Sequence, residues 1–147
     1  MRGVARGLRV ASVHGPDAGE RLALPLYLCR VPAGFPSPAS DYVEQEIDLG
    51  ELVRNRLATF CARVEGDSME ATLRDGDLLV VDRSLEPRHG DVIVACVEGD
   101  LTVKRLLTEG GRYFLSADNP AYPRLELDGD CDSVIWGVVT YSVRRLR

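Results

Sequence analysis

The stretch Phe60-Cys61-Ala62-Arg63-Val64-Glu65-Gly66-Asp67-Ser68-Met69 decides the fold that we expect for this chain. Phe60, Ala62 and Val64 alternate with other side chains, and this period of two is typical of a strand with one buried face. The Gly-Asp pair that follows permits a tight turn, which would present the hydroxyl of Ser68. A serine in such a turn is either a plain turn residue or a nucleophile, and a nucleophile needs a base beside it.

Outward from this stretch, more short runs of β-forming residues continue toward the C-terminus. Turn signals that combine glycine with aspartate, glutamate or histidine separate them. The runs cover 78–81, 91–97, 101–107, 112–116 and 134–143. Six or more short strands at this spacing predict a mostly β chain with a compact antiparallel core.

The region before the core differs in charge and composition. Residues 1–33 carry five arginines against two acidic residues, a net charge of +3. Three prolines and a glycine fall within 32–38, so this segment is extended and exposed, either as a plain linker or as a protease substrate. Asp48 with Glu51 resembles a capping box that opens one short helix. We therefore expect a flexible arm at 1–33, a linker with the short helix at 34–55, and the β core at 56–147.

Composition excludes several classes of protein. The 147 residues are 45% hydrophobic and 28% charged, which suits one globular domain with an arm. No apolar run approaches the ~20 residues that span a bilayer, and the basic start has no apolar segment of a secretory signal. The net charge of −5 argues against direct sequence-specific DNA binding. The four cysteines are widely spaced without a C-x-x-C motif, so we expect reduced thiols in a cytoplasm, no metal and no cofactor.

Lysine is almost missing from the chain. Of the 18 basic residues 17 are arginine, and the one lysine is Lys104. Arginine keeps its proton in proteins, whereas a desolvated lysine can lose it. Lys104 is therefore either present by chance, with no special role, or it is the residue that carries out chemistry for which a neutral amine is needed. In a strand it shares a face with Thr102, and since Lys104 and Arg105 are adjacent, only one of the two cations can easily point to solvent.

Three residues are candidates for the base that would activate Ser68. His14 lies in the basic arm, and His89 shares one turn with Asp91, a spacing that seldom gives triad geometry. Lys104 needs a pKa lowered from about 10.4 to about 7.5, roughly 4 kcal/mol of differential solvation, which apolar burial can supply. Its neutral amine could take the serine proton and return it to a leaving amine. Main-chain N–H groups of Asp67 and Ser68 would hold the oxyanion.

These residues together resemble the LexA/UmuD family of self-cleaving Ser–Lys peptidases. The resemblance rests on Gly66-Asp67-Ser68, on Thr102-Val103-Lys104 and on Ala33-Gly34-Phe35-Pro36-Ser37-Pro38, and it runs from about residue 24 to the C-terminus. Segments 41–45, 75–79, 89–91 and 137–139 also fit. The resemblance implies a LexA/signal-peptidase-like β core, with Ser68 as nucleophile, Lys104 as general base and the Ala33–Gly34 bond as the cleavage site. The loop 70–74 is one residue shorter than the family pattern, and residues 1–20 match nothing in that pattern.

The same resemblance implies a function in the SOS response to DNA damage. RecA–single-stranded DNA filaments would stimulate autoproteolysis, and the product 34–147 would form a homodimer. That homodimer would be the accessory subunit of a UmuC-like Y-family DNA polymerase in translesion synthesis and SOS mutagenesis.

Three other interpretations of the sequence remain. A LexA- or prophage-type repressor would need an N-terminal DNA-binding domain, for which 33 residues are too few. A type I signal peptidase would need a membrane anchor, and the sequence shows none. A non-enzymatic binding module of the same fold, with Ser68 and Lys104 inert, is the third alternative. Loss of residues 1–33 on incubation at high pH would separate an enzyme from such a module.

Overall fold

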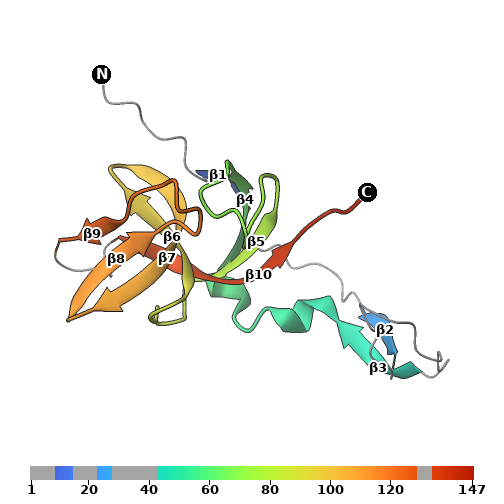
Figure 1. The fold of residues 1–147 in the computed structure, drawn as a ribbon. Coiled ribbons are helices and arrows are strands. Elements are labelled where there is room, and N and C mark those ends of the chain that lie inside the picture. The colour runs from blue at the N-terminus through green and yellow to red at the C-terminus, as the bar shows by residue number, and fades with distance from the viewer. Residues whose placement is uncertain (1–8, 15–22, 28–42, 129–133) are drawn as a thin grey trace. The chain divides into compact units, whose positions relative to one another are not determined.

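The computed structural model describes residues 9–14, 23–27, 43–128 and 134–147 (Figure 1). The chain divides into two units. One unit combines residues 1–16 with 55–147, and the other covers 17–54. The predicted Ala33–Gly34 cleavage site lies outside the described residues.

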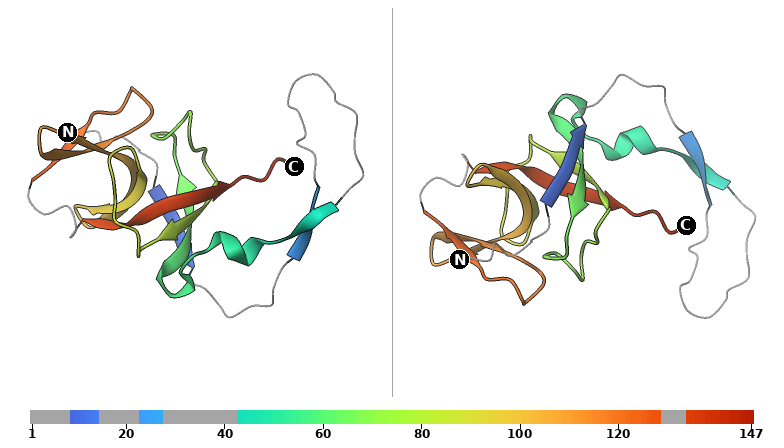
Figure 2. Two further views of the ribbon diagram at one scale, coloured as in Figure 1. Left: turned by 90° about the horizontal axis from the view of Figure 1, so that it is seen from below. Right: turned by 90° about the horizontal axis from the view of Figure 1, so that it is seen from above.

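The larger unit is built on one antiparallel sheet of eight strands, in the order β1-β4-β5-β10-β6-β7-β8-β9. The strands are β1 (Arg9–His14), β4 (Thr59–Glu65), β5 (Leu78–Asp82), β6 (Val92–Val97), β7 (Asp100–Glu109), β8 (Arg112–Ser116), β9 (Leu125–Leu127) and β10 (Ile135–Val143). β10 runs through the middle of this unit, between β5 and β6 (Figure 2). Arg9 of β1 also pairs with Thr102 of β7, so six of the strands close into a ring.

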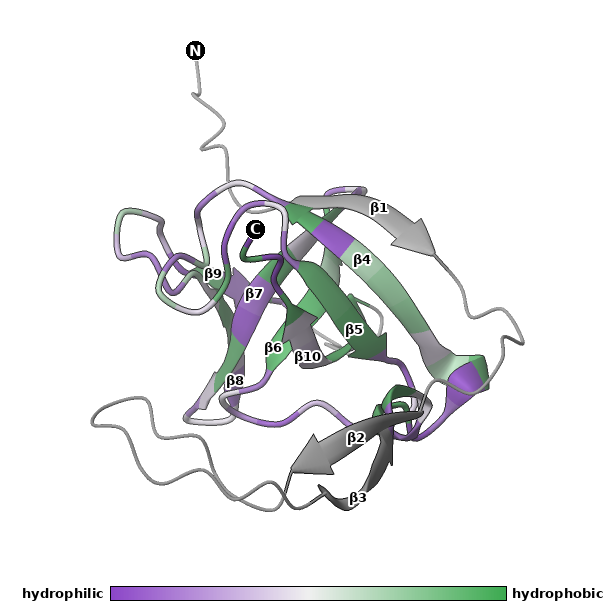
Figure 3. Cartoon of the chain, turned by 90° about the vertical axis from the view of Figure 1, so that its right-hand side faces the viewer, coloured by the Kyte–Doolittle hydropathy of each residue, from purple (hydrophilic) through white to green (hydrophobic). Residues whose placement is uncertain are grey.

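Apolar side chains fill the interior of this unit. The burial of β4 alternates as its sequence predicts, with Phe60, Ala62 and Val64 inside and Arg63 exposed. The hydrophobic residues of β5 and β6 form continuous stretches (Figure 3). Each fully buried aliphatic side chain contributes about 1.5–3 kcal/mol. Two clusters result, one with Phe60, Ala62, Val64, Met69, Leu73, Leu79, Val81, Val94 and Val103, the other with Ile93, Ala95, Leu106, Leu115 and Val138.

The smaller unit contains a two-stranded antiparallel sheet, β2 (Ala23–Tyr27) with β3 (Val43–Asp48). A single 3-10 turn, η1 (Leu49–Leu52), follows β3. Asp48 is its N-cap and accepts a hydrogen bond from the N–H of Gly50 at 2.9 Å. The expected short helix therefore begins at the residue that the capping signal predicts. It is a single 3-10 turn and not an α-helix. A second 3-10 turn, η2 (Arg56–Ala58), precedes β4 in the larger unit.

The predicted fold class is confirmed, since the described chain is mostly β and antiparallel. All six predicted strands are present, but β1, β2, β3 and β9 were not expected. β2 contains a proline, and β9 is a three-residue strand with two exposed positions, so neither shows the alternation of a half-buried strand. β1 and β2 both lie in segment 1–33, for which the sequence predicts a flexible arm. None of the helices among the described residues is long and apolar enough to cross a bilayer.

Candidate active site

A tight turn at the end of β4 carries Ser68. Gly66 adopts φ 101°, a left-handed conformation that glycine tolerates without strain. The N–H of Glu70 donates to the carbonyl of Asp67 at 3.0 Å and closes the turn. Both Ser68 and the next residue, Met69, are fully buried, so the hydroxyl faces the protein interior. We call residues 66–70 the nucleophile turn.

Lys104 reaches this turn from β7. Its Nζ lies 2.9 Å from Ser68 Oγ, within hydrogen-bond distance. The same nitrogen lies 3.3 Å from Thr102 Oγ1 and 3.3 Å from the carbonyl oxygen of Val103. Thr102 therefore shares the face of Lys104, as the strand period predicts. The structure thus brings together the two side chains that are 36 residues apart in the chain.

The surroundings of Lys104 favour its neutral form. Burial lowers the pKa of Lys104, because an ammonium loses hydration there that an amine does not need. Within the described part of the chain, no carboxylate forms an ion pair with Lys104. In the neutral state the Ser68 hydroxyl can donate its hydrogen bond to the lone pair of Nζ. This arrangement suits proton transfer from serine to lysine.

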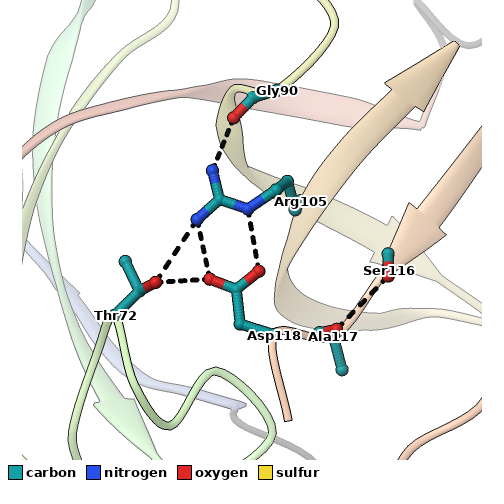
Figure 4. A network of polar contacts seen from close by, with 6 residues as sticks. All are labelled: Thr72, Gly90, Arg105, Ser116, Ala117 and Asp118. Carbon is teal, nitrogen blue, oxygen red and sulfur yellow. Dashed lines mark hydrogen bonds and ion pairs between the residues drawn. The ribbon is translucent and has the colours of Figure 1, made fainter. Parts of the chain in front are cut away.

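Arg105, the next residue on β7, is also held by protein groups. Its Nε and one terminal nitrogen donate to the two carboxylate oxygens of Asp118 at 2.8 and 2.7 Å. Its other terminal nitrogen donates to the carbonyl of Gly90 at 2.6 Å, and Thr72 joins the same cluster (Figure 4). The pKa of Asp118 is lowered, chiefly because Arg105 donates to it. The sequence analysis expects at least one of the two adjacent cations to meet protein, and in the structure both do.

The segment after β8 contacts the nucleophile turn directly, which the sequence analysis missed. The N–H of Asn119 donates to the carbonyl of Ser68 at 2.9 Å, and its Nδ2 donates to the carbonyl of Asp67 at 3.2 Å. The hydroxyl of Tyr122 donates to the carboxylate of Asp67. The cluster Asp118-Asn119-Pro120 reads in sequence only as a turn signal, so nothing in it pointed to Ser68.

The histidine alternative gains no support from the described contacts. His89 Nδ1 accepts a hydrogen bond from the N–H of Thr108 at 2.8 Å, four residues along β7 from Lys104. His14 lies in β1, opposite Cys61 of β4.

A pocket of about 460 Å³ lies against the nucleophile turn and is lined by Gly66, Asp67, Glu70, Leu73, Arg74 and Asp75.

Known proteins resemble this chain over most of its length. The sequence model of the family described as Peptidase S24-like matches residues 25–140. Protein MucA of Salmonella typhimurium is 50% identical over 139 residues, which cover 92% of this chain and 94% of MucA. Protein ImpA of Shigella flexneri is 44% identical over 136 residues, 90% of this chain and 91% of ImpA. The LexA repressor of Shewanella denitrificans is 38% identical over 135 residues, 91% of this chain but 64% of the repressor.

Proposed function

The chain belongs to the peptidase S24-like family, and from this premise we propose that it is a serine peptidase that cuts its own backbone between Ala33 and Gly34. Ser68 is the nucleophile and Lys104 is the general base. The observation that carries the proposal is the 2.9 Å separation of Ser68 Oγ and Lys104 Nζ at a buried site. A solitary lysine whose pKa is lowered by burial is the kind of group that this chemistry requires.

The first half of the reaction forms an ester. Neutral Lys104 accepts the proton of Ser68 as Oγ attacks the carbonyl carbon of Ala33. Main-chain N–H groups of Asp67 and Ser68 stabilise the oxyanion that develops there. The Lys104 ammonium then gives its proton to the nitrogen of Gly34, the C–N bond breaks, and residues 1–33 stay attached to Ser68 through their carboxyl end.

The second half releases that ester with water. Lys104 is neutral again and removes a proton from a water molecule as the oxygen attacks the ester carbon. The proton then returns to Ser68 Oγ as the ester bond breaks, which restores the dyad. The products are a peptide of residues 1–33 and a chain of residues 34–147, and no metal or organic cofactor takes part.

The pairing of β2 with β3 supports segment 28–42 as the substrate of the reaction. Tyr27 pairs with Val43, so segment 28–42, which contains the proposed scissile bond, starts and ends on neighbouring strands. A short segment tied at both ends loses less conformational entropy when it is bound than a free peptide does. A substrate on the same chain also reaches a high effective concentration at the dyad. A glycine at position 34 would allow close approach of a nucleophile to the backbone, and prolines favour an extended conformation.

The relatives support a role in SOS mutagenesis. MucA and ImpA are UmuD-like proteins, and each covers at least 90% of this chain. In this role a RecA–single-stranded DNA filament stimulates the cleavage. The product 34–147 forms a homodimer that serves a UmuC-like Y-family polymerase as an accessory subunit in translesion synthesis. Both the filament and the polymerase are cytoplasmic partners.

Intact-mass measurement of the purified full chain tests the enzyme and the stimulation together. We expect loss of residues 1–33 and a new Gly34 terminus at pH 10, and faster loss at pH 7.5 when an activated RecA filament is added. Ser68→Ala is the control, because it removes only the nucleophilic oxygen, and it should stay intact in both conditions. An unchanged wild-type mass would favour the non-enzymatic binding module.

A further inference from the structure

The carbonyl oxygen of the peptide group between Asp67 and Ser68 is held by two hydrogen bonds. The carbonyl oxygen of Asp67 accepts from the N–H of Glu70 at 3.0 Å and from Nδ2 of Asn119 at 3.2 Å. The peptide group is planar and trans, so its N–H points away from its C=O. Whatever fixes the carbonyl of Asp67 therefore also fixes the direction of the Ser68 N–H.

Asn119 holds the next peptide group as well. Its own N–H donates to the carbonyl of Ser68 at 2.9 Å. One residue thus binds two successive carbonyls, on both sides of the Ser68 Cα. Together these bonds restrict rotation of the backbone about Ser68, which also limits where its Oγ can lie.

Asn119 is itself anchored at several points. Its Oδ1 accepts from the N–H of Ala121 at 3.0 Å, which fixes the amide so that Nδ2 faces Asp67.

The residues next to Asn119 anchor the same segment. Asp118 forms the two-bond ion pair with Arg105 on β7, beside Lys104 (Figure 4). The carbonyl of Asn119 accepts from the N–H of Tyr122 at 3.2 Å, and the Tyr122 hydroxyl donates to Asp67. The strand that carries Lys104 and the turn that carries Ser68 are thereby joined through one short segment.

We propose that Asn119 is a positioning residue for the self-cleavage reaction, one that aims the Ser68 N–H at the oxyanion through the Asp67 carbonyl. The inference rests on the proposed function, since it assigns a task within that reaction. Loss of one direct oxyanion donor costs about 10²–10³ in rate in other serine peptidases. Loss of a group that only aims a donor should cost less, about tenfold to hundredfold.

The test compares two asparagines whose side-chain oxygens each accept a hydrogen bond from a main-chain N–H two or three residues further along the chain. Asn55 Oδ1 accepts from the N–H of Ala58, as Asn119 Oδ1 does from that of Ala121, but Asn55 precedes β4 whereas Ser68 follows it. Self-cleavage of the full chain is followed by intact mass from pH 6 to 10 for wild type, Asn119→Ala and Asn55→Ala. We expect Asn119→Ala to cleave about tenfold to hundredfold more slowly and Asn55→Ala to cleave at the wild-type rate.

The pH profile separates aiming from general damage to the site. If Asn119 only aims the donor, the rate falls by the same factor at every pH and the midpoint of the profile, which reports Lys104, stays in place. If the substitution opens the site to water, the midpoint rises toward that of an ordinary lysine, and the inference is overturned. A wild-type rate in Asn119→Ala overturns it as well.

A second variant covers the case in which Asn119→Ala does not fold. Asn119→Asp keeps an oxygen that can accept from Ala121 but cannot donate to Asp67, so it should also be slow. Wild-type cleavage in Asn119→Asp would contradict the assignment. If wild type itself does not cleave at any pH, the proposed function fails, and that outcome differs from failure of the inference, in which wild type cleaves and the asparagine variants cleave equally fast.

Discussion

Lys104 and Arg105 are adjacent on β7, yet their surroundings act on their protons in opposite directions. Burial lowers the pKa of Lys104, whereas the hydrogen bonds to Asp118 raise the pKa of Arg105. Arg105 therefore keeps its charge and holds the segment that contacts the nucleophile turn. Lys104 is left with a tendency to lose its proton beside Ser68. We therefore expect that lysine and arginine cannot be exchanged at these two positions.

The rate of self-cleavage should rise with pH, because only deprotonated Lys104 can accept the serine proton. The lowered pKa of Lys104 should make the rate level off below the value of about 10.4 for a free lysine. First-order rates from intact mass between pH 6 and 10 check this. A rate that does not change over this range would contradict the role of Lys104.

Asp77 should make the fold sensitive to acid. It is 2% exposed and accepts from Arg144 at 2.7 Å and from the N–H of Arg74 at 2.9 Å, and the hydrogen bond from Arg144 is the main reason why its pKa is lowered. A carboxyl with a lower pKa in the folded state stabilises the fold above about pH 4, and this stabilisation is lost as the pH falls through the folded-state pKa. Urea unfolding of Ser68→Ala at pH 7 and pH 3 measures the difference.

In that uncleaved background, Asp77→Asn should lower stability at pH 7 by about 1–3 kcal/mol, since a buried charge-assisted pair is lost. It should also lose less stability between pH 7 and pH 3 than its parent does. If both variants lose the same unfolding free energy between pH 7 and pH 3, Asp77 is not one of the groups that make the fold sensitive to acid.

Met69 should anchor the nucleophile turn in the core. It is fully buried in the cluster that includes Val64 and Leu79, directly after Ser68. Met69→Ala should cost about 2–5 kcal/mol of unfolding free energy, because it leaves a cavity. Met69→Leu, which nearly conserves volume, should cost under about 1.5 kcal/mol. Denaturant unfolding of both variants in the Ser68→Ala background provides the comparison, and equal losses would argue against close packing at this position.

Gly137 should tolerate no side chain. A Cβ there would lie 2.8 Å from Val81 Cγ1 and 3.1 Å from the carbonyl oxygen of Asp82. Gly137→Ala should therefore destabilise the sheet by about 1–3 kcal/mol through overpacking. Ser142→Ala, at an exposed position of the same strand, is the matched control and should change stability by less than about 0.5 kcal/mol. Equal unfolding midpoints for the two variants would contradict the packing at Gly137.

The sequence predicts the parts of the fold in which one side of a strand is buried. The alternation around Ala62 and the glycine-rich turns were enough to place the core strands, and the family resemblance is confirmed by the match over residues 25–140. β9 has no buried face and β2 contains a proline, so pattern alone could not find them.

The sequence predicts only those residues of the candidate site whose type, or whose neighbours in the chain, point to a chemical role. Lys104 stood out because the chain has no other lysine, and Ser68 because a Gly-Asp turn precedes it. Asn119 could not be found in this way. Its bonds to Asp67 and Ser68 join segments that are about 50 residues apart, and two of the groups that it binds are main-chain carbonyls, which every residue type has.

The rate of self-cleavage in Lys104→Arg tests the central claim most directly. Arginine keeps the positive charge at this position but does not lose its proton at any pH used here. If Lys104 is the general base, the wild-type chain loses residues 1–33 at pH 10 while Lys104→Arg keeps its full mass and its wild-type unfolding midpoint in urea. Cleavage of the folded Lys104→Arg chain at the wild-type rate would contradict the account.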